Sequence, residues 1–138
     1  MHVGSSGMAG LLEAFASGEA ARVSRVPMNR RRLMNAERIP LIEILDVLAN
    51  AQRMEILRKL KSPRDSFPPQ DEGDPVLDGV CVSSIQAGQG LAFSTTSKYL
   101  ADLARIGLVT VKRSGKWSYY KRNEKAIGAV IARLKTEL

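Results

Sequence analysis

Apolar side chains recur every three or four residues across the middle of the chain, and this spacing predicts two amphipathic helices. Asn50 stands between them, and its side chain is expected to cap the second helix by accepting from exposed backbone N–H groups. Pro63 is expected to end that helix. The first apolar stripe contains Leu41, Ile44, Leu45 and Leu48, and the second contains Met54, Leu57 and Leu60.

A second helical pair is predicted further along the chain. Residues 80–86 fit a short helix, and Gly88 and Gly90 mark a turn after it. Ser94 is the expected N-cap of a stronger helix, and Gly107 has the position of the glycine that ends it. The inward face of this helix is expected to contain Thr96, Leu100 and Leu103.

Two extended runs with alternating polarity follow, over residues 108–113 and 117–121. Ser114-Gly115 between them suits a tight hairpin. Residues 124–138 return to helical spacing. The order predicts a mainly α chain with a β-hairpin wing, a winged helix-turn-helix with an α-α-α-α-β-β-α core.

Residues 62–79 have a different composition, with four prolines, two glycines and five of the chain's 14 acidic residues. Arg64 is their only basic residue. This predicts a long loop or a flexible spacer inserted in the domain. We therefore expect a leader or arm over residues 1–38, with a short helix in 11–20, and a winged helix-turn-helix domain over 39–138.

The charge is segregated along the chain. The 138 residues have a net charge of +7, and without residues 62–79 there remain 20 basic and 9 acidic residues, or +11. Residues 94–125 hold eight basic and two acidic residues. Such a balance favours nucleic acid, an acidic protein or an anionic membrane surface as partner, although it is also compatible with ordinary surface charge. No apolar run approaches the roughly 18 residues of a membrane span, and no signal peptide is evident, so a cytoplasmic protein is expected.

The predicted second helix and hairpin have the chemistry of a DNA-binding surface. Short hydroxyls and a lysine at a helix start can bond phosphates or base edges in the major groove, and a cationic hairpin can lie along the phosphates. The candidate residues on the helix are Ser94, Thr95, Ser97, Lys98 and Tyr99. Those on the hairpin are Lys112, Arg113, Lys116 and Tyr120.

Three segments resemble the ArsR/SmtB group of bacterial regulators. LANAQRMEIL at 48–57, STTSKYL at 94–100 and GKWSYY at 115–120 are similar to that group's N-terminal helix motif, recognition helix and wing. The resemblance spans roughly residues 41–122. It implies a homodimer paired through N- and C-terminal helices, which reads a near-palindromic operator in double-stranded DNA. It also implies repression that is relieved by a ligand or metal.

The sequence departs from the metal sensors of that group. Where they carry two thiols, this chain reads Cys81-Val82-Ser83, and residues 124–138 contain no histidine. Soft metals favour two or three thiolates, so we expect no metal and no other cofactor. The signal is expected to be non-metal, either a small molecule or a redox change. Cys81 itself is expected to be a small buried apolar residue.

The aromatic residues near the predicted site allow two interpretations each. Phe93 is expected to pack inward; if exposed, it is positioned to contact thymine methyl groups. Trp117 is assigned to the core. Tyr119 and Tyr120 point to opposite faces of a strand, so one is expected in the core and the other near a phosphate.

Two other classes of function make different demands on the sequence. A winged-helix protein–protein module would keep the fold without specific DNA binding. An enzyme would need paired carboxylates, a nucleophile with a base, or a phosphate-binding loop, and we find none of these; His2 is the single histidine. We therefore assign no catalytic residue.

Overall fold

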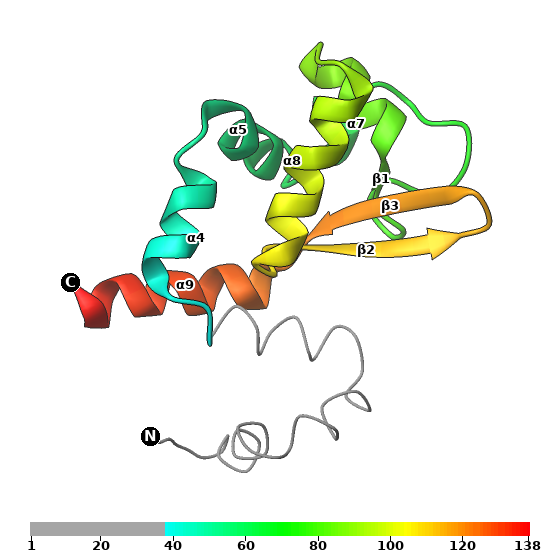
Figure 1. Ribbon diagram of the computed structural model, residues 1–138. Helices are drawn as coiled ribbons and strands as arrows, with labels where there is room; N and C mark the ends of the chain where they lie inside the picture. The colour runs from blue at the N-terminus through cyan, green and yellow to red at the C-terminus, as the bar shows by residue number, and fades with distance from the viewer. Residues whose placement is uncertain (1–37) are drawn as a thin grey trace. The chain divides into compact units, whose positions relative to one another are not determined.

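The computed structural model describes residues 38–138 (Figure 1). The predicted leader, with its helix in 11–20, lies outside the described residues. The elements are α4 (Leu41–Leu48), α5 (Ala51–Lys59), α6 (Pro63–Ser66), β1 (Val80–Cys81), α7 (Val82–Gln89), α8 (Phe93–Arg105), β2 (Val109–Ser114), β3 (Trp117–Arg122) and α9 (Glu124–Glu137). Helices followed by a small antiparallel sheet form a winged helix-turn-helix, which confirms the predicted fold.

Helices α4 and α5 are the two predicted amphipathic helices. Asn50 caps α5, and its side chain accepts from the N–H of Arg53 at 2.9 Å. Met54, assigned to the apolar stripe, is 46% exposed, because Ile56 occupies the core position on this helix instead. Helix α5 ends before Pro63, and that residue begins α6. The largest fully buried side chains are Ile44, Ile56, Ile85, Leu100, Leu103, Ile106 and Leu108.

Helices α7 and α8 are the helix-turn-helix pair. The first begins two residues later than predicted, because Val80 and Cys81 pair with β3 as a strand. The second begins two residues earlier, so Ala92 is the N-cap and Ser94 lies within the first turn. Its predicted inward face is confirmed, since Thr96, Leu100 and Leu103 are fully buried.

Gly107 ends α8 as predicted. Its φ of +82° is a left-handed conformation that favours glycine. The N–H of Gly107 donates to Ala104 O at 3.0 Å, and that of Leu108 donates to Leu103 O at 3.1 Å. This is the Schellman arrangement, which bonds the last helical carbonyls and turns the chain sharply into β2.

The sheet has the strand order β1-β3-β2, and both pairs are antiparallel. Ser114 pairs with Trp117, so the hairpin turns through Gly115-Lys116, one residue later than predicted. Gly115 has a φ of +61°, which suits a two-residue hairpin turn. Because β1 pairs with Tyr119 and Tyr120, the base of the wing is held on both sides while its tip projects (Figure 1).

Residues 62–79 pack against the domain, and the flexible-spacer interpretation is wrong. Phe67 is buried, and a methyl group on Gly88 of α7 would lie 2.7 Å from its ring. Gly73 packs equally closely on the Tyr119 ring. The Ser84 hydroxyl donates to Pro68 O at 3.0 Å. The proline-rich composition therefore encodes a shaped loop.

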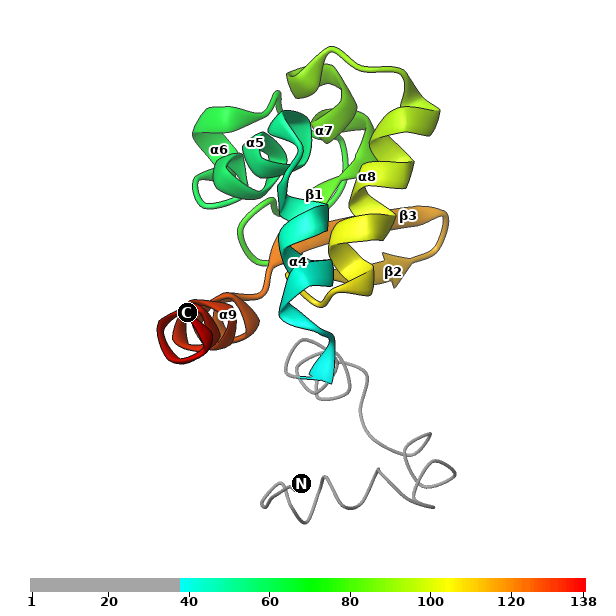
Figure 2. The ribbon, with the colours of Figure 1, turned by 60° about the vertical axis from the view of Figure 1, so that its left-hand side comes forward.

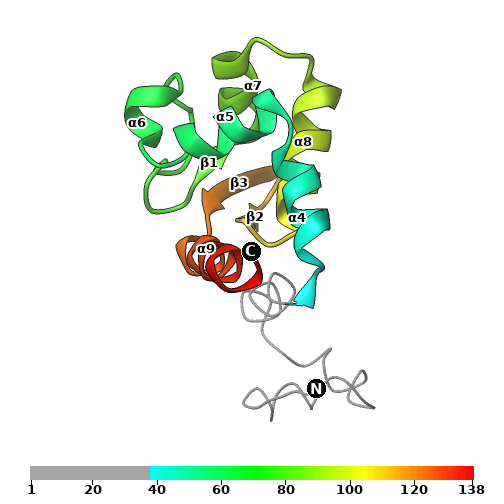
Figure 3. The ribbon, with the colours of Figure 1, turned by 90° about the vertical axis from the view of Figure 1, so that its left-hand side faces the viewer.

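Helix α9 lies beside α4 (Figure 3). The guanidinium of Arg133 donates to Ile39 O at 2.6 Å, which connects α9 to the start of α4. Within residues 38–138, no helix is long and apolar enough to span a membrane.

Candidate nucleic-acid interface

The first two turns of α8 present the polar residues predicted to contact DNA. Ser94 and Lys98 are exposed, the latter 73% at its side chain, and Thr95 and Ser97 are half-buried. Thr96 faces the opposite way, where its hydroxyl donates to Ala92 O at 3.0 Å. The buried side of α8 thus fixes which side chains it presents to solvent.

An arginine that the candidate set omits braces this helix. Arg53 Nη1 lies 3.3 Å from an Asp102 carboxylate oxygen, and its Nε donates to Val47 O at 2.6 Å. Its guanidinium also lies 5.3 Å from the centre of the Tyr99 ring. Tyr99 therefore packs half-buried between helices, and Arg53 joins α4, α5 and α8. The arginine of the motif at 48–57 was the available signal for this role.

Asp102 also limits how freely Lys98 moves. The Lys98 Nζ lies 3.6 Å from the Asp102 carboxylate, one turn further along α8. This pair is exposed on the lysine side, so it contributes little to stability. It does draw the ammonium group toward Asp102, on the side of Lys98 away from Ser94 and Thr95.

The three cations predicted on the wing have different surroundings. Lys112 Nζ lies 2.6 Å from a carboxylate oxygen of Asp78 in the 62–79 loop. Arg113 donates to the Ser118 hydroxyl at 2.9 Å across the hairpin. Lys116, at the turn, lies 5.5 Å from the centre of the Trp117 ring. All three side chains are exposed. Arg113 and Lys116 place positive charge at the wing tip, whereas the charge of Lys112 is paired with the carboxylate of Asp78.

Two aromatic assignments are corrected. Trp117 is half-buried outside the hydrophobic core, because it is near the projecting tip. Phe93 is 56% exposed, because the earlier start of α8 places it in the first helical turn beside the polar residues. The exposed alternative weighed for Phe93 is therefore the one that the structure favours.

Both tyrosines of β3 are packed, on opposite faces of the sheet. Tyr119 is buried beneath the loop at Gly73, and loss of hydration raises the pKa of its hydroxyl. Tyr120 is half-buried against the core and pairs with Val80 and Val111. Tyr120 thus lies at the base of the wing, away from its cationic tip.

Cys81 is buried and free, with its Sγ 3.3 Å from the Ser83 hydroxyl, which confirms that it is a small buried residue. Among the residues that the structure describes, no cluster of three or more His, Cys, Asp or Glu side chains is placed to hold a metal ion.

The helix start and the wing tip both lie on the part of the molecule away from α9. Figure 2 shows the beginning of α8 and the β2–β3 turn on one side of the molecule, both directed away from α9. A hydroxyl-rich helix end next to a cationic hairpin can enter a major groove while the hairpin contacts the flanking phosphates. This is the geometry of a helix-turn-helix transcriptional regulator.

Comparison with known proteins agrees with this class. The chain is 44% identical over 97 residues to the uncharacterized HTH-type transcriptional regulator YbzH of Bacillus subtilis (strain 168), covering 70% of this chain and 97% of that protein. It is 31% identical over 83 residues to a candidate arsenical resistance operon repressor, ArsR2, of Halobacterium salinarum, covering 60% and 59% respectively. No protein-family model matches the chain. The chain belongs to the ArsR family of DNA-binding transcriptional regulators.

Proposed function

We propose that this protein is a homodimeric repressor that reads a specific operator and is released by a non-metal signal. The observation that carries the proposal is the exposed polar start of α8 beside the cationic wing tip (Figure 2). Ser94, Thr95, Ser97 and Lys98 contact bases or phosphates in the major groove, and Tyr99 orients the helix. Lys112, Arg113 and Lys116 bind the DNA backbone.

Dimerisation is supported by apolar side chains on the outer faces of the terminal helices. Ile42 of α4 is 72% exposed, and Ile131 of α9 is 54% exposed. These two helices pack together, so both exposed isoleucines belong to one helix pair that a second copy is expected to cover. An Ile131→Asp variant is expected to shift the sedimentation coefficient from dimer to monomer. An unchanged sedimentation profile would contradict pairing through α9.

A non-metal signal is supported by the thiol content. The name of the Halobacterium relative refers to arsenical resistance, and soft metals and metalloids favour two or three thiolates. This chain has only Cys81, and that residue is buried. A single chain therefore lacks the set of thiols for such a site, and we propose that another kind of molecule releases the DNA.

DNA binding is tested by selecting bound fragments from random duplexes and measuring affinity against salt. A specific operator with two similar half-sites is expected, with the logarithm of the association constant falling as salt rises. Lys116→Gln should weaken binding to all sequences and reduce the salt slope by about one for each protomer of the bound dimer. Lys61→Gln, an equal charge change at an exposed position between α5 and α6, should leave both unchanged.

The competing function, a protein–protein module with a winged-helix fold, predicts a different outcome. No duplex would be enriched, and any residual binding would be independent of sequence and would disappear as salt rises. If an operator is selected, repression is tested separately by placing that operator between a promoter and a reporter gene. Expression that rises when the protein is present would indicate an activator.

A further inference from the structure

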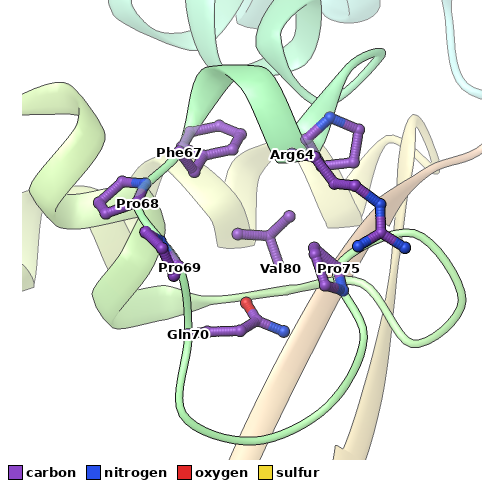
Figure 4. Close-up of a pocket in the computed structure, with 8 residues that line it drawn as sticks. Arg64, Phe67, Pro68, Pro69, Gln70, Pro75 and Val80 are labelled. Carbon is purple, nitrogen blue, oxygen red and sulfur yellow. The ribbon is translucent and has the colours of Figure 1, made fainter.

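The inserted loop forms a pocket of its own, separate from the DNA-binding surface. A cavity of about 290 Å³ is lined by Pro63, Arg64, Phe67, Pro68, Pro69, Gln70, Pro75 and Val80. Figure 4 shows the Phe67, Pro68 and Pro69 rings on one side, Val80 between, and Pro75 with the Arg64 guanidinium on the other. Apolar walls with one charged group are typical of small-molecule sites, and the volume is at their lower limit.

The lining selects the shape and charge of a ligand. The phenylalanine ring is flat and the proline rings are rigid, so together they favour a flat apolar body about one ring in size. At the end of the pocket near Pro75, Arg64 supplies a cation. Its contacts with Asp74 use only Nη2, at 2.9 and 3.2 Å, and the guanidinium has five N–H donors in all. The remaining edge suits a carboxylate, which arginine binds with two parallel hydrogen bonds.

The pocket is connected to the wing by a chain of polar contacts. Arg64 pairs with the Asp74 carboxylate, and the Asp74 backbone N–H donates to Asp78 Oδ2 at 2.7 Å. Asp78 Oδ1 in turn accepts from Lys112 Nζ at 2.6 Å. These contacts run in series from Arg64 in the pocket wall to Lys112 in the wing. A ligand that engages Arg64 therefore acts on the ion pair between Asp78 and Lys112.

A second connection runs to the base of the sheet. The Gln70 amide nitrogen donates to Gly79 O at 3.0 Å, and its carbonyl oxygen accepts from the Cys81 N–H at 3.0 Å. This side chain thus bonds the pocket wall to β1, which pairs with β3. Phe67 meanwhile packs against Gly88 of α7. The pocket therefore contacts both the sheet and the helix that supports α8.

We propose that this pocket binds a small aromatic carboxylate, which draws Arg64 from Asp74, leaves the acidic loop more negative beside Lys112 and so lowers the affinity for DNA. The proposal deepens the proposed function by naming the class of its releasing signal. Its binding step can be measured without DNA, so that failure of ligand binding and failure of DNA binding are separate results.

The first experiment titrates the full-length protein with sodium benzoate, followed by amide NMR. Saturating shifts in residues 63–80 are expected, with a Kd on the order of 1 mM for so small a molecule. Benzyl alcohol, which has the ring without the charge, should bind about tenfold more weakly. Shifts that do not saturate, or that lie outside this segment, would overturn the proposal.

Three variants test the role of Arg64. Arg64→Gln should weaken benzoate binding about tenfold, and Arg58→Gln, an exposed arginine of α5 outside the pocket, should not change it. Asp74→Asn removes the competing carboxylate and should tighten binding. This third variant keeps the test valid if Arg64→Gln does not fold. Equal affinity in Asp74→Asn and wild type would count against a ligand carboxylate on Arg64.

The second experiment measures operator affinity with and without saturating benzoate. A reduction of at least about threefold is expected in the wild type, and Asp78→Asn should still bind benzoate but lose most of this reduction. Benzoate binding that leaves operator affinity unchanged, or raises it, would overturn the connection to the wing. Absence of DNA binding in the benzoate-free sample would instead refute the proposed function.

Discussion

The carboxylate of Asp78 and the ammonium group of Lys112 lie 2.6 Å apart, which pairs an acidic loop with a cation of the wing. The two residues are 34 positions apart in the sequence. Any phosphate that binds Lys112 must share it with this carboxylate. The loop therefore reduces the positive charge that the wing offers to DNA.

Asp78→Asn is expected to strengthen binding to all DNA sequences, because Lys112 then binds a phosphate without a competing carboxylate. The salt slope should become steeper by about one for each protomer of the bound dimer. Fluorescence anisotropy at several salt concentrations measures both quantities. Asp65→Asn, an exposed carboxylate of α6 in the same loop, is the matched control. Similar changes in both variants would indicate an effect of net charge alone.

Phe93→Ala is expected to reduce operator affinity where a thymine methyl group lies against the exposed ring. Loss of one such apolar contact costs about 1–3 kcal/mol of discrimination at that base pair. Operators in which uracil replaces thymine test this, because they lack the methyl group. The wild type should discriminate between the two operators at one position, and the variant should not. Retained discrimination in Phe93→Ala would assign methyl recognition to another residue.

Substitution of two helical glycines is expected to have opposite effects on stability. A methyl group on Gly88 would lie 2.7 Å from the buried Phe67 ring, whereas one on Gly128 of α9 meets open space. Gly128→Ala should raise the free energy of unfolding by about 0.5–1 kcal/mol, and Gly88→Ala should lower it by about 1–3 kcal/mol. Urea denaturation gives both values. A stabilised Gly88→Ala variant would show that the Phe67 ring shifts without cost.

Acid is expected to detach the loop from the wing. Hydrogen bonds from the backbone N–H groups of Leu77 and Val76, together with Arg64, lower the pKa of Asp74 below its ordinary value of 3.8. The backbone N–H of Asp74, together with Lys112, lowers the pKa of Asp78 likewise.

Folded pKa values below the unfolded ones mean that this stabilisation is present above about pH 4 and is lost as the pH falls through the lowered values. NMR signals of Gly73 and Tyr119 should therefore change below pH 3.8. In an Asp74→Asn, Asp78→Asn double variant this acid transition should disappear. An identical transition in that variant would assign it to other carboxylates.

Most of the helix-turn-helix could be predicted from the sequence, but the conformation of the inserted loop could not. Helical spacing identified Thr96, Leu100 and Leu103 as the buried side of α8, because periodicity records which face meets the core. Helix ends were less accurate: Ala92, without a side-chain cap, precedes α8 where Ser94 was expected. A residue with a hydroxyl side chain near the start of a helix fits the first turn as well as the N-cap position, so Ser94 alone did not define where α8 begins.

The loop was misjudged because its contacts join residues distant in sequence. Its proline content predicts an irregular backbone, but nothing local shows that Gly73 will meet Tyr119 or that Asp78 will meet Lys112. The placement of Trp117 was wrong for a related reason. Alternation gives the two faces of a strand, whereas the distance from the core depends on how far the hairpin projects.

The pairing of β1 with Tyr119 and Tyr120 sets the length of the free part of the wing. Flanked on both sides, the base of β3 is held by more hydrogen bonds than the turn at Gly115-Lys116, so we expect movement to be greatest at the turn. The distance from α8 to the cationic tip is consequently almost constant. The protein therefore sets the spacing between the bases that α8 contacts and the phosphates that the wing contacts. Inserting one base pair between these two parts of an operator should reduce affinity more than changing one contacted base or phosphate.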